Sequence, residues 1–360
     1  MNAHNYLTGL ALALALLPGC RRGGADGFVT KGPDGVVTLA VGATADLTEP
    51  VTDFRLENYF ELVGEIFPSE EDPRTYLSSM TIFHADDQSV FVASRERVVR
   101  LSLKDGSFLC EYGRKGRGPG EYVQAFMCFV QDGEVYVNDT MSQCHVYAVE
   151  DGRLLREFPL FEKTSQFSCY APLDKDHGVI CFSSLAGKDH LFDVVDASLQ
   201  LVRASSLPME SVPDGGIRTG FACRMGGKLC VPYEEPNLVL YQVSAGKDTP
   251  WVRLDKGSYT AYTSSGDHWL IEDEWKSFGP FFFVSLRRKS VSSAIAVYDL
   301  KHRALVLYKA AVDAKSSRKM GLPYTRDGQT LYLYPVFSDG DMLVCQDRTG
   351  PDNYYCFKQK

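Results

Sequence analysis

The sequence has no excess of positive charge. Its 38 Lys and Arg are outnumbered by 46 Asp and Glu, so the formal net charge is −8. Nucleic-acid binding depends largely on neutralising phosphates, and an acidic chain gains little from it unless its cations gather on one face. The charge balance therefore argues against nucleic acid as a partner. With 44% hydrophobic residues, the chain can still bury a sizeable core.

The short motifs of common catalytic and metal sites are also missing. None of the ten cysteines forms a C-x-x-C pair, the seven histidines form no H-E-x-x-H, and no G-x-S-x-G occurs. These absences argue against zinc ribbons, thioredoxin-like redox centres, zinc proteases and α/β-hydrolases. We expect no metal and no cofactor, and we assign no catalytic residue. A catalytic carboxylate pair could still be assembled from distant parts of the chain.

Three cysteine pairs nevertheless straddle predicted turns: Cys169/Cys181, Cys223/Cys230 and Cys345/Cys356. Disulfides are possible there in an oxidising compartment. A two-residue turn at Gly226-Gly227 would, however, place the second pair at a hydrogen-bonded position, where side chains diverge. The odd number of cysteines after Cys20 and their scattered positions also fit buried thiols. We expect mostly free thiols.

Only one long apolar run occurs, "YLTGLALALALLPGC", and it is too short to span a bilayer as a helix. It ends at Leu17-Pro18-Gly19-Cys20, which resembles a bacterial lipobox with lipidation at Cys20. Pro18 and the absence of Lys or Arg before the run depart from that pattern. The alternative is an ordinary signal peptide. We predict a signal segment over 1–20, a tether over 21–40 and a lipid anchor in the cell envelope, facing the periplasm rather than the exterior.

The rest of the chain shows no helical periodicity but a repeated pattern of short strands. "DDQSVFVASRERVVRLSLKDGSFLCEYG" aligns with "QDGEVYVNDTMSQCHVYAVEDGRLLREF", and the pattern continues more loosely. Equivalent turns fall at Asp105, Asp151, Asp196, Ala245 and Asp299, which lie 46, 45, 49 and 54 residues apart. Asp-Gly between alternating apolar residues is a strong hairpin signal. Repeats of this length with four strands each are typical of β-propeller blades.

We therefore predict an all-β, six-bladed β-propeller over 41–360, with four-stranded antiparallel blades. Its last strands come from "GQTLYLYPVFSDGDMLVCQDRTGPDNYYCF". Because a ring of blades closes best when both chain ends share a blade, we assign residues 51–66, "VTDFRLENYFELVGEI", to the last blade as its closing strand. The alternative is an N-terminal strand packed on the surface.

One string is more specific than the repeats. Residues 113–122, "GRKGRGPGEY", follow strand-like runs behind a lipobox, with "LENYFELVGEI" before them. Together these features resemble the six-bladed β-propeller lipoproteins of Bacteroidota, relatives of the NHL-repeat propellers. The resemblance covers roughly 40–360 and is strongest in the first two blades. It implies the fold and an envelope location, but no settled biochemical activity.

The same string raises the question of ligand binding. Its glycines and three cations suggest an anion-binding loop, but a strand follows it, so it is neither a P-loop nor a dinucleotide fingerprint. The alternative is a shaped crossover between blades one and two. Loops expected on the same face carry further cations. The predicted ligand-binding residues are Arg95, Arg114, Lys115, Arg117, Glu121, Tyr122, Tyr233, Arg287 and Arg288.

These observations predict a binding or protein-interaction module, for an anionic sugar or peptide or for an envelope protein partner. The alternative is a lyase or hydrolase acting on a glycan or peptide, with its site in the propeller channel. An enzyme would need titratable groups that converge in the channel, whereas a binding protein can use arginines and aromatic rings alone. A third alternative is a subunit of an envelope complex.

Overall fold

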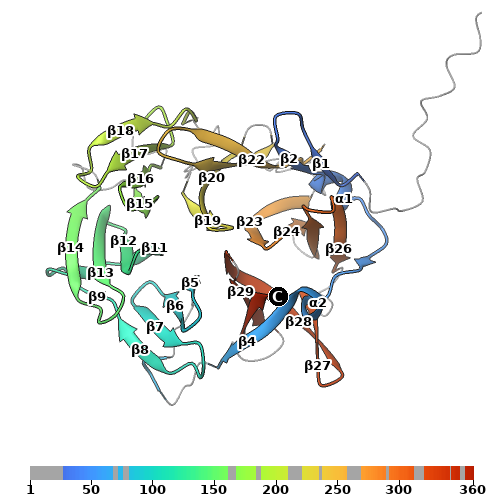
Figure 1. Cartoon of the computed structure of the whole chain (residues 1–360), viewed down its shortest axis with the longest axis horizontal. Helices are drawn as coiled ribbons and strands as arrows, with labels where there is room; N and C mark the ends of the chain where they lie inside the picture. The colour runs from blue at the N-terminus through green and yellow to red at the C-terminus, as the bar shows by residue number, and fades with distance from the viewer. Residues whose placement is uncertain are drawn as a thin grey trace, which may run out of the picture.

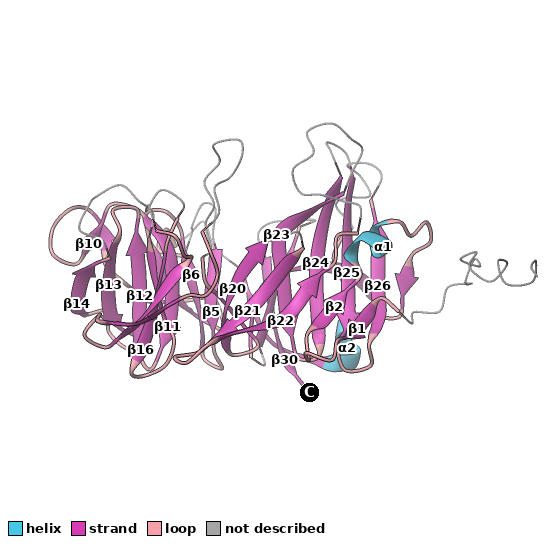
Figure 2. Ribbon diagram, turned by 90° about the horizontal axis from the view of Figure 1, so that it is seen from above, coloured by secondary structure: helices cyan, strands magenta, loops and turns pink. Residues whose placement is uncertain are grey.

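The computed structural model describes residues 27–67, 72–75, 81–160, 168–183, 188–209, 221–234, 237–257, 269–288, 292–311, 320–340, 342–348 and 353–360. Six mainly antiparallel sheets of four to six strands stand in a ring (Figure 1). The predicted fold, a six-bladed β-propeller, is confirmed. Seen from the side, the strands run between the two faces of the ring (Figure 2).

The first three blades each have four strands in sequence order from the channel outward. Blade one contains β5 (Thr81–Ala85), β6 (Ser89–Ala93), β7 (Val98–Ser102) and β8 (Phe108–Glu111). Blade two contains β11 (Ala125–Gln131), β12 (Glu134–Asp139), β13 (Gln143–Ala148) and β14 (Leu154–Pro159). Blade three contains β15 (Cys169–Pro172), β16 (His177–Cys181), β17 (Phe192–Asp196) and β18 (Leu201–Ala204). Between blades one and two lie the two-residue strands β9 (Arg114–Lys115) and β10 (Glu121–Tyr122).

The other three blades also have four consecutive strands each, and strands from the N-terminal part of the chain add to all three. Blade four contains β19 (Cys223–Met225), β20 (Lys228–Glu234), β21 (Leu238–Val243) and β22 (Asp248–Leu254). Blade five contains β23 (Trp269–Phe278), β24 (Phe281–Arg288), β25 (Ser292–Asp299) and β26 (Ala304–Ala310). Blade six contains β27 (Leu322–Arg326), β28 (Gln329–Asp339), β29 (Met342–Asp347) and β30 (Asn353–Gln359). The long strand β28 packs beside β5 and β23, so it is the inner strand of this blade.

An N-terminal strand closes the ring. β4 (Phe60–Ile66) pairs antiparallel with β30, with Ile66 opposite Tyr354 and Phe60 opposite Gln359. The predicted closing strand is therefore confirmed over 60–66. Its earlier part differs from the prediction, because β3 (Val51–Thr52) pairs with β26 of blade five and the short helix α2 (Leu56–Tyr59) follows. Phe54, buried against Phe281 with ring centroids 4.9 Å apart, anchors the chain where it passes between the two blades.

Residues predicted as part of the tether also join the propeller. β1 (Val29–Lys31) pairs with β2 (Val37–Leu39), and β2 runs parallel to β22 on the outer edge of blade four. The helix α1 (Val41–Ala45) follows, and Tyr298 of blade five donates a buried hydrogen bond of 2.9 Å to Thr44. Residues 29–45 are thus packed on blades four and five. Cys20 lies outside the described residues.

Local sequence explains why the blades form. At the turn between β11 and β12, Asp132 and Gly133 have φ of 51° and 78°, the positive values that a two-residue primed hairpin requires. Strand position then decides burial. In β12 five of six residues are buried, whereas in the outer strand β14 none is. Apolar side chains accordingly fill the space between neighbouring blades, and the core forms a ring.

The nine described cysteines are all free thiols, and eight of them are buried. Cys223 lies opposite Cys230 across the Gly226-Gly227 turn, as the sequence predicts. Cys345 lies opposite Tyr355 rather than Cys356. Within the described part of the chain, no helix is both long enough and apolar enough to cross a membrane.

Candidate functional site

The inner strands enclose a cavity of about 490 Å³ at the centre of the ring, which we call the channel. Blades one, two, four, five and six all contribute to its wall. The lining residues are 81–84, 127–130, 221–225, Pro232, 275–276 and 336–338. Small-molecule sites typically have volumes of roughly 300–1,000 Å³. The channel therefore has room for a small ligand.

Arg224 enters the channel from β19. Its Nη2 atom donates to the carbonyl oxygen of Pro172 at 2.8 Å and to the side-chain oxygen of Gln131. Its Nε atom is buried and has no hydrogen-bond partner among the described residues. Burial lowers the pKa of Arg224, although Asp339 and Asp132 oppose that shift. An arginine nonetheless stays charged at neutral pH, so Arg224 gives the channel wall a positive charge.

A second buried polar group in the wall also has no hydrogen-bond partner among the described residues. Ser338 on β28 is 3% exposed, and its hydroxyl oxygen also lacks a partner in the part of the chain that the structure describes. Lys276 on β23 adds a second cation to the lining. No described lining residue is Asp or Glu. Buried polar groups are normally hydrogen-bonded, so these groups favour an anionic ligand that would complete their bonding.

Among the described titratable groups of the channel wall, His84 on β5 has the usual pKa closest to 7. Its ring lies edge-on to Phe91 and Phe337, with centroids 5.2 and 6.4 Å away. Burial lowers the pKa of His84 below its usual 6.5, and Asp86 and Asp339 only partly oppose this shift. At pH 7 the ring is therefore neutral.

The remainder of the wall is apolar and includes Phe83, Met127, Phe221 and Trp275. Two thiols, Cys128 and Cys223, also line it. Burial raises the pKa of both, to about 11 for Cys223, so they are protonated at neutral pH and are weak nucleophiles. Among the described residues no three His, Cys, Asp or Glu side chains are grouped so as to hold a metal ion. The channel thus combines an apolar wall with an arginine.

Residues 113–122, which we call the mouth loop, connect β8 to β11. They pack against β14, the outer strand of blade two, where the Gly120 N–H donates to Glu157 at 3.1 Å, and none of them lines the channel. The loop binds an anion, but that anion is its own Glu121. The Glu121 carboxylate accepts hydrogen bonds from the backbone N–H groups of Gly118 at 2.8 Å and Arg117 at 3.0 Å, and from Arg114 Nε at 2.6 Å. A Cβ at Gly116 would lie 2.0 Å from that carboxylate. The glycines and the glutamate of the string therefore belong to one self-contained structure.

The predicted cations around the mouth loop lie close together. Arg114 is 80% exposed and pairs with Glu121, while Lys115 pairs with Glu96 at 2.5 Å. Arg117 is exposed, and so is Arg95, whose carbonyl oxygen accepts a hydrogen bond from Ala125. The structure thus joins the 94–97 loop to the mouth loop. Exposed ion pairs of this kind are weak, so they do not by themselves indicate a binding site.

The predicted aromatic residues are buried. Tyr122 is fully buried, and its hydroxyl donates to the Glu96 carbonyl at 3.5 Å. Tyr233 is 8% exposed and packs edge-on against Tyr241 at 6.2 Å. Both rings belong to core clusters that span neighbouring blades, so neither presents a face to a ligand. Arg287 and Arg288 end β24, and their side chains lie outside the described residues.

The sequence did not predict four residues of the channel wall: Arg224, Ser338, His84 and Lys276. One signal was present, because "CRMGGKLC" places an arginine within an otherwise apolar run directly before a two-glycine turn. A charged side chain on a predicted inner strand can only face the channel or break the blade. The partners of that side chain come from other blades, so no local pattern identifies them.

No known protein family matches this sequence, and no curated protein matches it. Among solved structures, the chain is similar to a Bacteroides fragilis protein described as exported, with a TM-score of 0.61 and 15% identity over 86% of this chain and 97% of that one. It is also similar to the WD40 repeats of RRP9, with a TM-score of 0.43 and 8% identity over 87% and 100%. The likeness is one of fold.

Proposed function

We propose that this protein is a binding module whose channel takes a short peptide with a free C-terminal carboxylate and apolar side chains. The observation that carries the proposal is a pair of buried polar atoms in the channel wall, Arg224 Nε and Ser338 Oγ, that have no hydrogen-bond partner among the described residues. A carboxylate suits a guanidinium because it can accept two N–H bonds. The apolar wall with Phe83 and Trp275 suits the remainder of a peptide.

Binding is favoured over catalysis by the same lining. The thiols are protonated, His84 is neutral, and no carboxylate lines the described wall, so a general acid and base pair of carboxylates has no counterpart there. Arg224, Lys276 and the aromatic rings are sufficient for recognition.

For the location, we propose a lipid anchor at Cys20 that holds the propeller in the cell envelope on the periplasmic side. The lipobox-like residues before Cys20 support the anchor, and the likeness to a protein described as exported is consistent with it. Phase separation in detergent tests it. The protein should enter the detergent phase, and Cys20→Ser should move it to the aqueous phase. Equal partitioning of both would refute the anchor.

The channel is tested by calorimetric titration of the full chain with apolar tetrapeptides, each as a free acid and as a C-terminal amide. We expect the free acids to bind and the amides to bind about 10- to 150-fold more weakly, as expected for a lost hydrogen bond to a charged group. Arg224→Ala should weaken free-acid binding by a similar factor. Arg153→Ala, which removes a side chain that is 68% exposed on blade two, is the matched control and should change nothing. Equal binding of acid and amide would sink the proposal, as would full binding by Arg224→Ala.

A further inference from the structure

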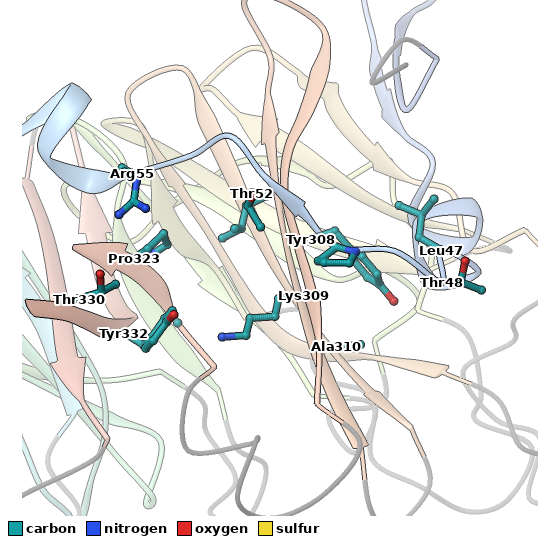
Figure 3. Close-up of a pocket in the computed structure, with 13 residues that line it drawn as sticks. Leu47, Thr48, Thr52, Arg55, Tyr308, Lys309, Ala310, Pro323, Thr330 and Tyr332 are labelled. Carbon is teal, nitrogen blue, oxygen red and sulfur yellow. The ribbon is translucent and has the colours of Figure 1, made fainter. Parts of the chain in front are cut away.

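A second cavity, of about 500 Å³, lies on the rim between blades five and six, and we call it the rim groove. Three parts of the chain form it: the segment from Leu47 to Arg55, the end of β26, and the hairpin of β27 and β28 (Figure 3). In Figure 1 the β27–β28 hairpin extends outward from the ring beside blade five. The rim groove shares no lining residue with the channel.

Thirteen of the described residues line the rim groove; two of them are cations and none of them is acidic. Arg55 is 49% exposed, and it is held over the groove by a hydrogen bond of 3.3 Å to Thr325 and a longer contact of 4.0 Å with Glu57. Glu57 also accepts a hydrogen bond from the backbone of Thr325 at 3.2 Å. Its carboxylate is thus directed at β27 and is not part of the lining.

The second cation is combined with an aromatic ring. Lys309 Nζ lies 3.9 Å from the centre of the Tyr332 ring, and Figure 3 shows its side chain reaching across the rim groove from β26 towards that ring. Both side chains are partly exposed. The ammonium group therefore lies over one face of the Tyr332 ring, and this cation–π contact holds the positive charge in place beside the rim groove.

The rest of the lining is rich in hydroxyl groups. Thr48, Thr52 and Thr330 line the rim groove, and Thr48 and Thr330 are exposed at its edges. A hydroxyl can both donate and accept, which matches the hydroxyls of a sugar. The channel differs, since aromatic and aliphatic side chains dominate its wall. The two cavities are therefore suited to different ligands.

We propose that the rim groove binds an acidic saccharide, with Arg55 and Lys309 contacting its acid group and the threonines its hydroxyls, while Tyr332 positions the ammonium of Lys309. The acid group can be a carboxylate or a sulfate, because both accept hydrogen bonds from a guanidinium and an ammonium. The volume accommodates a disaccharide-sized ligand. This proposal does not depend on the function proposed for the channel.

The test uses the full chain and three probes with one disaccharide backbone: neutral cellobiose, cellobiose with one glucose oxidised to glucuronic acid, and cellobiose carrying one sulfate and no carboxylate. Affinities are measured by calorimetry at low salt. We expect at least one acidic probe to bind, and cellobiose to bind about 10-fold more weakly or not at all. The stronger of the two acidic probes identifies the acid group. Absence of binding by both acidic probes, or equal binding of cellobiose, would overturn the proposal.

Variants then locate the site. Lys309→Met keeps the length of the side chain and removes its charge, and Arg55→Ala removes the other cation. Each should weaken the acidic probe by about 5- to 20-fold. Lys104→Ala and Arg153→Ala remove exposed cations elsewhere and should leave affinity unchanged. Arg224→Ala should also leave it unchanged, since Arg224 lines the channel. If Lys309→Met and Arg55→Ala both bind like the wild type, the rim groove is not the site.

Discussion

The mouth loop and the channel are both positively charged, but they use their charge in opposite ways. In the mouth loop the backbone N–H groups and two of the three cations are occupied within the chain: Glu121 accepts from the N–H groups and pairs with Arg114, and Glu96 pairs with Lys115. In the channel, Arg224 keeps a buried donor without a partner among the described residues, and so does Ser338.

This contrast shows that the number of cations on a face is a poor guide to a binding site. What matters is which polar groups remain unpaired after the chain has folded, because burying such a group costs stability that a ligand can restore. We therefore expect substitutions in the mouth loop to change the stability of the fold, and substitutions in the channel to change ligand binding.

The largest expected effect is in the mouth loop, at Tyr122. Replacing this fully buried ring with alanine should lower the free energy of unfolding by about 3–5 kcal/mol, because it leaves a cavity beside Phe91 and Tyr147. Tyr122→Phe should stay within about 1 kcal/mol of the wild type, since its hydroxyl makes one long hydrogen bond. Urea unfolding followed by tryptophan fluorescence measures both. A small effect of Tyr122→Ala would mean that the ring is free to contact ligands.

Substitution of Arg224 should have the opposite pattern, with a small effect on stability and a large effect on peptide binding. Arg224→Met keeps a long apolar side chain in the channel wall while removing a charge whose desolvation is only partly compensated. Replacements of this kind are often neutral or stabilising. We expect the free energy of unfolding to change by no more than about 1 kcal/mol, while binding of the free-acid peptide weakens about 10- to 150-fold. If Arg224→Met instead unfolds as readily as Tyr122→Ala, Arg224 is a structural residue and the comparison fails.

Much of the fold could be predicted because its information is local and repeated. The turns at Asp105, Asp151 and Asp299 each connect the third and fourth strands of a blade, and their spacing is enough to predict a ring of six. The closing strand followed from the need to avoid an exposed edge. Residues 29–39 were predicted as tether and not as strands, because two three-residue strands are too short to give a periodic signal. Their place in the fold comes from the pairing of β1 with β2 and of β2 with β22.

The candidate site could be predicted much less well. Pairing between Glu121 and the mouth loop is local, and the string of glycines suggested a loop that binds an anion. That the anion is Glu121 itself became clear only from the contacts. The channel is assembled from five blades, so the partners of Arg224 lie 93 and 52 residues away along the chain. No sequence pattern of one blade contains that information.

The smallest expected effects are on pH dependence, and they should have opposite directions in the two regions. The N–H of Gly118 and the side chain of Arg114 lower the pKa of Glu121 below its usual 4.5. A carboxylate whose pKa is lowered in the folded state contributes stability above its unfolded pKa and loses it as the pH falls through the folded pKa. Amide resonances of Arg117 and Gly118 should therefore titrate with a midpoint below 4.5 and be constant from pH 5 to 7.

In the channel, acidification should strengthen anion binding. Because burial lowers the pKa of His84 below 6.5, the ring is neutral at pH 7 and gains a proton only as the pH falls. The new charge adds to Arg224 and Lys276 and should raise the affinity for an ionised peptide carboxylate as the pH falls through the lowered pKa of His84. His84→Gln should abolish the rise without affecting the Glu121 titration. If the ring of His84 is seen to gain its proton by NMR and the affinity does not rise with it, the peptide carboxylate does not reach His84, and its binding position must lie elsewhere along the channel.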